Sequence, residues 1–388
     1  MPENKKNAKV AISGYYGFGN CGDEAVLLSI ISCLRQLKPD TRIVVFSNDP
    51  SMTRSAYGVA AVNRWDPVKV AYELMTCRLL ISGGGSLLQD ETSTKSLYYY
   101  MGIIRLATFL KKKVMIYSQG IGPLNIEKHR ARVARLLNRC HTITVRDAVS
   151  ASLLGELGVK TEISTTCDPV MAFGIDDIDG AQIAGIEKDI AESGILDSAD
   201  GNRKPLMLAA IRCWKDNSHF GAVAEFLDTV IRSGWDVLLV SAHFPVDAEA
   251  IDGLRHLMAT QPHSLKKSVT ARQFLALTAR ADMVFSMRLH GLICGFTMGT
   301  PVIGISYDPK VDGFMAQAGL QKYCLPYDSF DAEAAKRLFE ELDAESGRRL
   351  HDGPGAEPHI SRQGSEARRT QLQELAWDAA KKAAQLLM

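Results

Sequence analysis

The chain has 388 residues, of which 46% are hydrophobic and 23% are charged, and its formal net charge is +1. This composition is typical of a soluble globular protein that is long enough to form two domains. A near-neutral charge disfavours a duplex-binding surface, so we expect no nucleic-acid partner.

In the first half of the chain, short apolar runs alternate with helical patterns. The predicted strands are Val10–Ser13, Ile43–Ser47, Leu79–Ser82, Val114–Ser118 and Ile143–Val145, and the helices between them are Asp23–Leu37, Ser96–Leu110, Lys128–Asn138 and Ala148–Leu157. Continuous apolar strands that alternate with helices predict a parallel sheet with helices on its faces.

The alternation restarts after an acidic, glycine-containing stretch. The later strands are predicted at Leu206–Ile211, Val237–Ser241, Met283–Ser286 and Val302–Ser306, and a loop at 351–359 precedes a final helix, Ser365–Leu387. We predict an α/β fold with two Rossmann-like, doubly wound domains that face a cleft. Their bounds would be 1–175 and 205–364. Residues 176–204 would connect them, with a short helix near Ala184–Glu192, and the helix at 365–388 would pack back on the first domain.

Cysteine usage and the N-terminal sequence indicate the compartment. The eight cysteines are scattered without a C-x-x-C pair, which disfavours a zinc site or a disulfide framework and favours a reducing environment. The polar residues 1–9 do not resemble a signal peptide, and no apolar run reaches the roughly 20 residues of a membrane span. We therefore expect a cytoplasmic protein.

Four loops with unusual compositions follow predicted strands of the first domain, and we expect them to share one edge of the sheet. Each also has a structural interpretation, such as a glycine turn with a capped helix, tight strand–helix packing, or a surface ion pair. The loop 14–24 contains G-x-G-x-x-G, which would suit a dinucleotide, but Asp23 and Glu24 would repel a pyrophosphate and suit sugar hydroxyls. The others are 82–90, with three glycines that allow close ligand approach and the polar pair Gln89 and Asp90, then 118–123, and Val145-Arg146-Asp147.

Basic residues gather at strand ends of the second domain. Arg288 and His290 lie between a predicted strand and the next helix, where helix N–H groups favour anions. Lys310 follows the next strand, and Arg212 follows the first strand of this domain. An arginine fork, a lysine and a histidine would bind an anionic substrate that undergoes proton-coupled chemistry.

Together these motifs resemble the polysaccharide pyruvyl transferases. The resemblance rests on the loops at 17–24, 83–90 and 119–123, the pairs Arg146-Asp147 and Asp168-Pro169, and Arg288-Leu289-His290-Gly291. It is greatest to the bacterial branch that pyruvylates secondary cell wall polymers, which anchor S-layer proteins. The resemblance implies a GT-B-like fold and an enzyme that transfers the pyruvyl group of phosphoenolpyruvate to N-acetylmannosamine. The product would be a 4,6-ketal on a lipid-linked GlcNAc–ManNAc precursor, formed with release of phosphate, without a metal and with no cofactor besides the co-substrate.

With this resemblance, each candidate residue receives a role. We expect Arg288 and His290 to be catalytic, with His290 in proton transfer or phosphate binding. The donor-binding set is Arg288, His290, Lys310, Arg146 and Arg212, and the acceptor-binding set is Asn20, Asp23, Glu24, Gly84, Gln89 and Asp90, in which Asp23 or Glu24 would be the base. A lipid-linked acceptor would bring the protein to the inner membrane leaflet, where lysines 111–113 or 266–267 would contact headgroups.

Three other functions remain open at this point. A GT-B glycosyltransferase that uses a nucleotide sugar would share the fold and the basic cluster. A dinucleotide-dependent oxidoreductase would use the loop 14–24. A non-catalytic sugar-binding protein would bind the acceptor without turnover.

Overall fold

The computed structural model describes residues 8–178, 180–195, 203–265, 267–345 and 362–388. The chain forms two compact units, Met1–Ala172 with Leu372–Met388, and Phe173–Gln371. The loop predicted at 351–359 lies outside the described residues. Within the part of the chain that the structure describes, no helix has the length and hydropathy needed to cross a bilayer.

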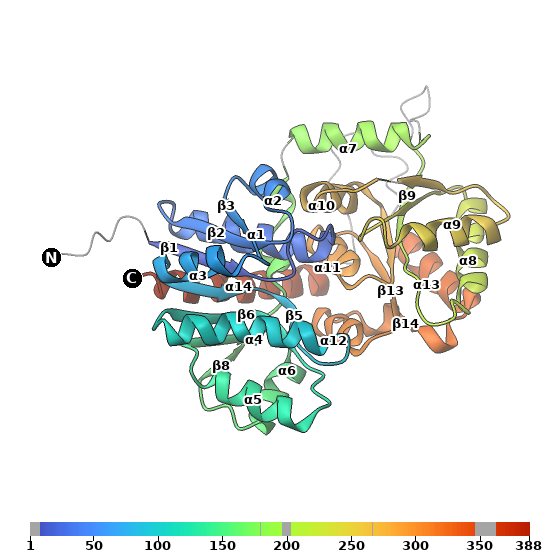
Figure 1. The fold of residues 1–388 in the computed structure, drawn as a ribbon. Coiled ribbons are helices and arrows are strands. Elements are labelled where there is room, and N and C mark those ends of the chain that lie inside the picture. The colour runs from blue at the N-terminus through green and yellow to red at the C-terminus, as the bar shows by residue number, and fades with distance from the viewer. Residues whose placement is uncertain (1–7, 179, 196–202, 266, 346–361) are drawn as a thin grey trace. The chain divides into compact units, whose positions relative to one another are not determined.

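The first unit contains a parallel sheet (Figure 1). Its strand order is β3-β2-β1-β4-β6-β7-β8, and β5 pairs with β6 outside this path. The strands are β1 (Lys9–Ser13), β2 (Arg42–Ser47), β3 (Ala60–Asn63), β4 (Leu79–Ser82), β5 (Gly85–Leu88), β6 (Lys113–Ile121), β7 (Thr142–Val145) and β8 (Ile163–Thr165). Because β1 and β4 are neighbours in register, Ser13 lies opposite Ser82 where both strands end.

Helices of the first unit begin at polar side chains that accept hydrogen bonds from the first turn. Asn20, Asp49, Asp66, Ser93 and Asp147 cap five of them in this way. The helices are α1 (Cys21–Leu37), α2 (Pro50–Tyr57), α3 (Pro67–Thr76), α4 (Thr94–Phe109), α5 (Glu127–Leu137) and α6 (Ala148–Glu156). In this unit α3 contacts α4 and α4 contacts α5, so the three lie side by side (Figure 1).

The second unit contains another parallel sheet, with the order β11-β10-β9-β12-β13-β14. Its strands are β9 (Leu206–Ala210), β10 (Asp236–Val240), β11 (His263–Leu265), β12 (Met283–Ser286), β13 (Val302–Ser306) and β14 (Cys324–Pro326). Its helices are α7 (Gly180–Glu192), α8 (Phe220–Arg232), α9 (Ala248–Leu257), α10 (Ala271–Arg280), α11 (Leu289–Thr297), α12 (Pro309–Ala318) and α13 (Ala332–Glu345). Helix α14 (Arg362–Gln385) begins in this unit, and its residues from Leu372 onward belong to the first.

Each unit has its own apolar core. In the first, Leu80 and Ile116 from the central strands pack with Leu97 and Ile104 of α4. In the second, Phe285 of β12 meets Phe226 of α8 edge to face, with ring centroids 4.8 Å apart. Strands buried on both faces account for the continuous apolar runs in the sequence.

The predicted fold class, with two Rossmann-like parallel-sheet domains, is confirmed, while several short elements differ. Three glycines suggested a loop throughout 82–90, yet Gly85–Leu88 forms the strand β5. The segment 176–204 was interpreted as a connection, but its described part belongs to the second unit, where α7 contacts α10. The last part of α14 packs in the first unit, where Leu372, Ala376, Ala379 and Ala383 are buried.

Candidate functional site

In each sheet the strands are added first toward one edge and then toward the other, so that the strand order reverses at one point. Several candidate residues follow the two strands on either side of this point. This switch point lies between β1 and β4 in the first unit and between β9 and β12 in the second. Open parallel sheets bind ligands beyond the carboxyl ends of the strands at such points. The loops after β1 and β4 contain the predicted acceptor residues Asn20, Asp23, Glu24 and Gly84, while Gln89 and Asp90 follow β5. The loops after β9 and β12 contain Arg212 and Arg288.

Glu24 has a structural role in the loop after β1. Its side chain is buried, and its two oxygens accept hydrogen bonds from Gly17 N at 2.7 Å and Tyr57 Oη at 2.5 Å. Burial raises the pKa of Glu24, although these two hydrogen bonds act in the opposite direction. We therefore assign Glu24 to loop closure and no longer to acceptor binding or to base catalysis. Because Glu24 occupies the Gly17 N–H, this group is also not free to bind a pyrophosphate.

The three consecutive glycines serve close packing. A Cβ on Gly83 would lie 2.1 Å from Tyr16 Oη, and one on Gly84 would lie 2.8 Å from Val26 Cγ1. Gly85 has a φ of +86° and faces Asp23, whose Oδ1 would be 3.0 Å from a Cβ. Gly84 thus permits helix–strand packing and is corrected from an acceptor contact to a packing position. Asp23 stays partly exposed beside Gly85.

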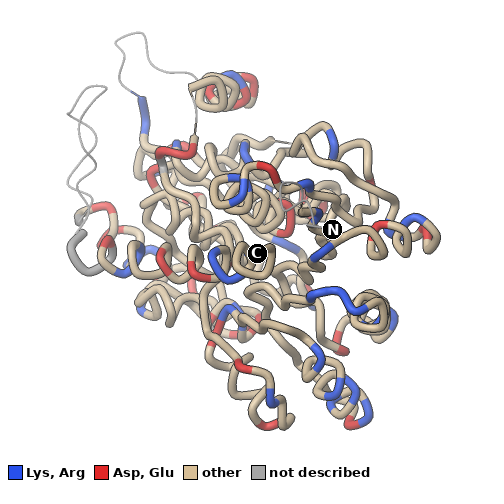
Figure 2. Tube along the Cα trace, turned by 90° about the vertical axis from the view of Figure 1, so that its left-hand side faces the viewer, with Lys and Arg blue, Asp and Glu red and all other residues tan. Residues whose placement is uncertain are grey.

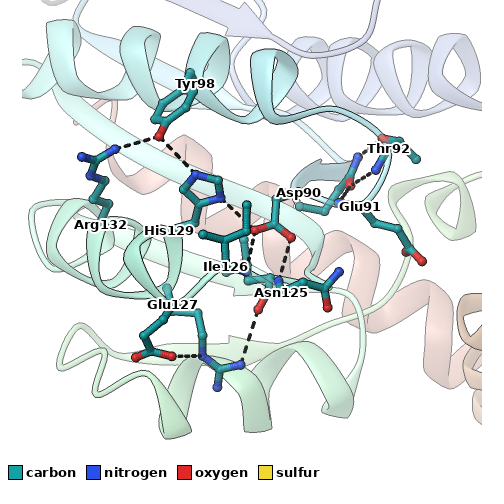
Figure 3. Close-up of polar contacts among 12 residues, drawn as sticks. Asp90, Glu91, Thr92, Tyr98, Asn125, Ile126, Glu127, His129 and Arg132 are labelled. Carbon is teal, nitrogen blue, oxygen red and sulfur yellow. Dashed lines mark hydrogen bonds and ion pairs between the residues drawn. The ribbon is translucent and has the colours of Figure 1, made fainter.

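Asp90 belongs to a network that holds the start of α5 (Figure 3). Its side chain is 0% exposed and accepts hydrogen bonds from Asn125 N at 2.7 Å, Ile126 N at 3.1 Å and His129 Nδ1 at 2.8 Å. Burial raises the pKa of Asp90, but the donors at Asn125, His129 and Ile126 outweigh it, so that the pKa is lowered overall. No side chain within α5 caps its first turn, and Asp90 supplies the acceptor from the loop after β5. We correct Asp90 from an acceptor contact to a structural residue.

The remaining loop residues of this edge are also held by local contacts. Gln89 Oε1 accepts from Glu91 N at 2.8 Å and Thr92 N at 3.0 Å, which closes a tight turn. Asn20 Oδ1 accepts from Gly22 N at 3.0 Å and caps α1. Gln89 thus closes a turn and Asn20 caps a helix, and both side chains also stay partly exposed, so their acceptor role stays a prediction.

Arg146 is anchored at the carboxyl end of β7. Its guanidinium donates to Ser86 Oγ at 3.1 Å and to Asp147 Oδ2 at 3.3 Å, and its Nη1 lies 3.9 Å from Asp168 Oδ2. A Cβ on Gly120 would lie 2.7 Å from Arg146 Nη2, so glycine is needed beside it. Two carboxylates compensate this cation, and it is a weaker anion site than its charge alone suggests.

Sequence reasoning missed a second arginine of the first unit, Arg64. It is buried, donates to Gly14 O at 2.9 Å and to Tyr100 Oη at 3.2 Å, and has no carboxylate partner among the described residues. Four aromatic rings surround its guanidinium at centroid distances of 4.3 to 5.3 Å, those of Phe18, Trp65, Tyr99 and Tyr100. Trp65 is 61% exposed, so an indole beside an uncompensated cation lies open near the acceptor loop. The only signal in the sequence was the Arg-Trp pair after a short strand.

Arg288 begins α11 in the second unit. Its guanidinium pairs with Asp247, which also accepts a hydrogen bond from His243 N at 2.9 Å. The side chains of Arg288 and Asp247 are 13% and 1% exposed. Because Arg288 is the N-cap residue, the positive end of α11 lies at the same sheet edge as the arginine. No side chain caps the first turn of α11, so its N–H groups can bind an anion.

Arg212 has the least compensated charge at this edge. Its Nη1 donates to Tyr307 Oη at 3.2 Å, and its guanidinium lies 5.1 Å and 5.2 Å from the ring centroids of Trp214 and Tyr307. No described carboxylate pairs with it. Lys310 also lies over the Tyr307 ring, at 5.7 Å, and its Nζ is 2.9 Å from Asp308 Oδ2. Tyr307 therefore links two of the predicted cations.

The arrangement of the second unit brings Arg212, Arg288, His290 and Lys310 to the ends of β9, β12 and β13, which are adjacent strands. His290 lies in the first turn of α11 and is partly exposed. Two carboxylates, Asp247 and Asp308, accompany this basic edge. Among the described residues, no group of three or more His, Cys, Asp or Glu side chains is placed to hold a metal ion.

Comparison with known proteins identifies the family. The model of the polysaccharide pyruvyl transferase family matches residues 20–309. The chain belongs to this family. A curated relative, the amylovoran biosynthesis protein AmsJ of Erwinia amylovora, is 22% identical over 363 residues, which cover 80% of this chain and 86% of AmsJ. The sequence resemblance is thereby confirmed at the level of the family.

Solved structures resemble the fold. Anabaena Alr3699/HepE, crystallised in complex with UDP-glucose, superposes with a TM-score of 0.63 at 12% identity, over 97% of this chain and 99% of that one. A glycosyltransferase from Rickettsia africae superposes with a TM-score of 0.61 at 12% identity, over 98% of each chain. This polysaccharide pyruvyl transferase thus has a GT-B-like fold.

Proposed function

We propose that this family member transfers the pyruvyl group of phosphoenolpyruvate to two hydroxyls of a saccharide and releases phosphate. The observation that carries the proposal is the basic edge of the second unit, where Arg212 lacks a described carboxylate partner and α11 presents an uncapped N-terminus. Phosphoenolpyruvate has two anionic groups, a phosphate and a carboxylate, and such an edge suits both.

The contacts that we expect with the donor depend on how far neighbouring carboxylates compensate the charge of each cation. Arg212 is held by two aromatic rings, the Tyr307 hydroxyl and the Cys213 carbonyl oxygen. Its Nη2 and the second N–H of Nη1 would bind a carboxylate or phosphate. Arg288 is oriented by Asp247 beside the helix end, and Lys310 adds a point charge from the next strand. Arg146 stays a secondary donor candidate because two carboxylates accompany it.

The reaction requires one proton at carbon and the loss of two from oxygen. Protonation of the methylene carbon C3 makes C2 oxocarbenium-like, and one sugar hydroxyl adds there and loses its proton. The C2–O bond to phosphate then breaks, and the second hydroxyl closes the ketal with loss of its proton. We assign His290 to the proton transfer at C3 or to the leaving phosphate, and Asp23 to the hydroxyl protons.

The acceptor would bind to exposed side chains of the first unit. Asp23 and Asn20 remain as hydroxyl-binding candidates, and we add the open face of Trp65 beside Arg64 as a stacking surface for a sugar ring. The acceptor that we propose is a lipid-linked saccharide that contains N-acetylmannosamine, which would receive a 4,6-ketal at the cytoplasmic leaflet. Since the related AmsJ is an amylovoran biosynthesis protein, acceptors with sugars other than N-acetylmannosamine belong in the acceptor panel.

The test is acceptor-dependent release of phosphate. Purified protein is incubated with phosphoenolpyruvate and a lipid-mimic GlcNAc–ManNAc acceptor, then with glucose- and galactose-containing acceptors, and the product is examined by mass spectrometry for a pyruvyl ketal. Release of nucleotide from a UDP-sugar, without use of phosphoenolpyruvate, would instead make the protein a GT-B glycosyltransferase. Binding of an acceptor without turnover of any donor would indicate that the protein is a non-catalytic sugar-binding protein.

Two substitutions distinguish the residues that bind the donor from those that bind the acceptor. Arg212→Ala removes charge-assisted contacts worth roughly 1.5–3 kcal/mol, so KM for phosphoenolpyruvate should rise about 10- to 100-fold while KM for the acceptor stays constant. Trp65→Ala should raise KM for the acceptor alone, by roughly tenfold for a stacking contact. Arg232→Ala, at an exposed arginine of the second unit, is the matched control. If both variants changed both constants equally, the substrate assignment would be wrong.

A further inference from the structure

Helix α3 has apolar side chains on two opposite faces. Val70 and Leu74 enter the core of the first unit, whereas Val68, Tyr72 and Met75 are 76%, 57% and 53% exposed. At about 100° per residue, positions 68, 72 and 75 form one stripe that points away from the core. A helix on the surface of a soluble domain normally presents polar residues there.

The neighbouring helix continues this exposed apolar surface. Phe109, the last residue of α4, is 80% exposed. Lys112, which follows it closely in sequence, donates from Nζ to Met75 O at 2.7 Å and ties the end of α4 to the end of α3. The stripe on α3 and the ring of Phe109 therefore belong to the same side of the unit.

The surrounding charge is predominantly positive. Between residues 67 and 139, which contain α3, α4 and α5, the sequence has 12 Lys and Arg against 4 Asp and Glu, although the whole chain is nearly balanced at 45 against 44. Lys128 and Arg135 of α5 are exposed. Figure 2 shows blue segments gathered on its right-hand side, which is the front of Figure 1, where these helices lie.

We propose that this α3–α5 face, made up of Val68, Tyr72, Met75, Phe109, Lys128 and Arg135, docks the protein on an anionic lipid bilayer. The apolar side chains would enter the headgroup region while the cations approach lipid phosphates. A soluble polyanion would use the cations alone and would leave the apolar stripe in water, so a lipid surface accounts for both features. The inference goes beyond the proposed reaction and does not depend on it.

The lysine runs that the sequence suggested for this purpose make other contacts. Lys113 Nζ donates to Leu386 O at 2.7 Å within the first unit, and Lys267 Nζ lies 2.5 Å from Asp189 Oδ1 in the second. Lys266 lies outside the described residues. Lys111 stays exposed just after α4 and adjoins the face, whereas the proposed contact itself is placed on the helices.

The experiment is flotation of the full chain with vesicles, without any substrate. Vesicles of phosphatidylcholine with and without phosphatidylglycerol are compared at low and high salt. We expect flotation with the anionic vesicles that decreases as salt increases. The double variant Val68→Ser/Met75→Ser should lower the partition coefficient about tenfold. Since each cation near the surface contributes roughly fivefold, Lys128→Gln/Arg135→Gln should lower it by about 25-fold.

Matched controls lie in the second unit. Ile183 and Leu257 are 48% and 57% exposed, and their double serine variant should float like the wild type. Lys188→Gln/Arg272→Gln is the corresponding charge control. Absence of flotation with anionic vesicles would overturn the proposal, as would equal losses in test and control pairs. Retention on heparin without flotation would make the face a polyanion site and would likewise overturn it.

Discussion

Replacing Arg288 by methionine should lower the free energy of unfolding of the second unit, in addition to any effect on substrate binding. The substitution keeps most of the side-chain volume. Among the described residues it leaves Asp247, whose side chain is 1% exposed, as a buried carboxylate with the His243 N–H as its one remaining donor. Removing one partner of a buried ion pair costs about 3–5 kcal/mol. Because Arg288 is 13% exposed and water would reach the vacated space, we expect a value near the lower end.

A double-mutant cycle measures this loss. Urea unfolding is followed for Arg288→Met, Asp247→Asn and the double variant. The introduced asparagine would still accept from His243 N but would not be charged, so the double variant should be more stable than Arg288→Met by at least about 1 kcal/mol. If the two single effects added to within about 0.5 kcal/mol, the pair would not be coupled and the reasoning would fail. In the folded fraction, KM for phosphoenolpyruvate should rise about 10- to 100-fold, and Arg288→Lys should not restore it fully because the planar fork is lost.

Two further predictions concern histidines. His290→Ala should lower kcat by roughly 10²–10⁴-fold while the thermal unfolding temperature stays unchanged, as expected for a general acid; near-normal turnover would place the proton donor in Lys310 or a carboxylate. Burial lowers the pKa of His219 to about 4, whereas the ordinary pKa of a histidine is about 6.5. Between these two pH values the unfolded chain binds a proton at this residue that the folded chain does not bind. Stability should therefore decrease by about 2 kcal/mol from pH 7.5 to pH 5, and His219→Phe should remove this part of the pH dependence in urea titrations. Equal pH dependence in both proteins would contradict the assignment.

The long apolar strands were predictable because parallel strands buried on both faces leave a continuous apolar signal. Leu79–Ser82, Met283–Ser286 and Val302–Ser306 were predicted with the bounds that the structure has. The edge strands Ile163–Thr165 and His263–Leu265 were missed because a strand of three residues gives almost no periodicity.

Residue type and position at a strand end were sufficient to place Arg212 and Arg288 at the switch point of the second sheet. The partner of each side chain could not be predicted in the same way. Glu24 and Tyr57 are 33 residues apart, and Arg288 and Asp247 are 41 residues apart. Such pairs depend on which strands are neighbours in the sheet, and a single sequence gives no local signal of that order.

The partners decide which polar residues remain available for a ligand. Glu24 and Asp90 looked like hydroxyl-binding carboxylates, but N–H and O–H donors of the protein occupy both. Arg212 was predicted from its position at a strand end, and Arg64 went unnoticed. Aromatic rings, a hydroxyl and carbonyl oxygens hold both side chains, and none of these groups cancels a positive charge. A cation that is fixed by neutral partners keeps its full attraction for an incoming anion and loses little side-chain entropy on binding. By this criterion Arg212 is a stronger candidate for the proposed donor site than Arg146, although only Arg146 belongs to the motifs on which the family resemblance rests.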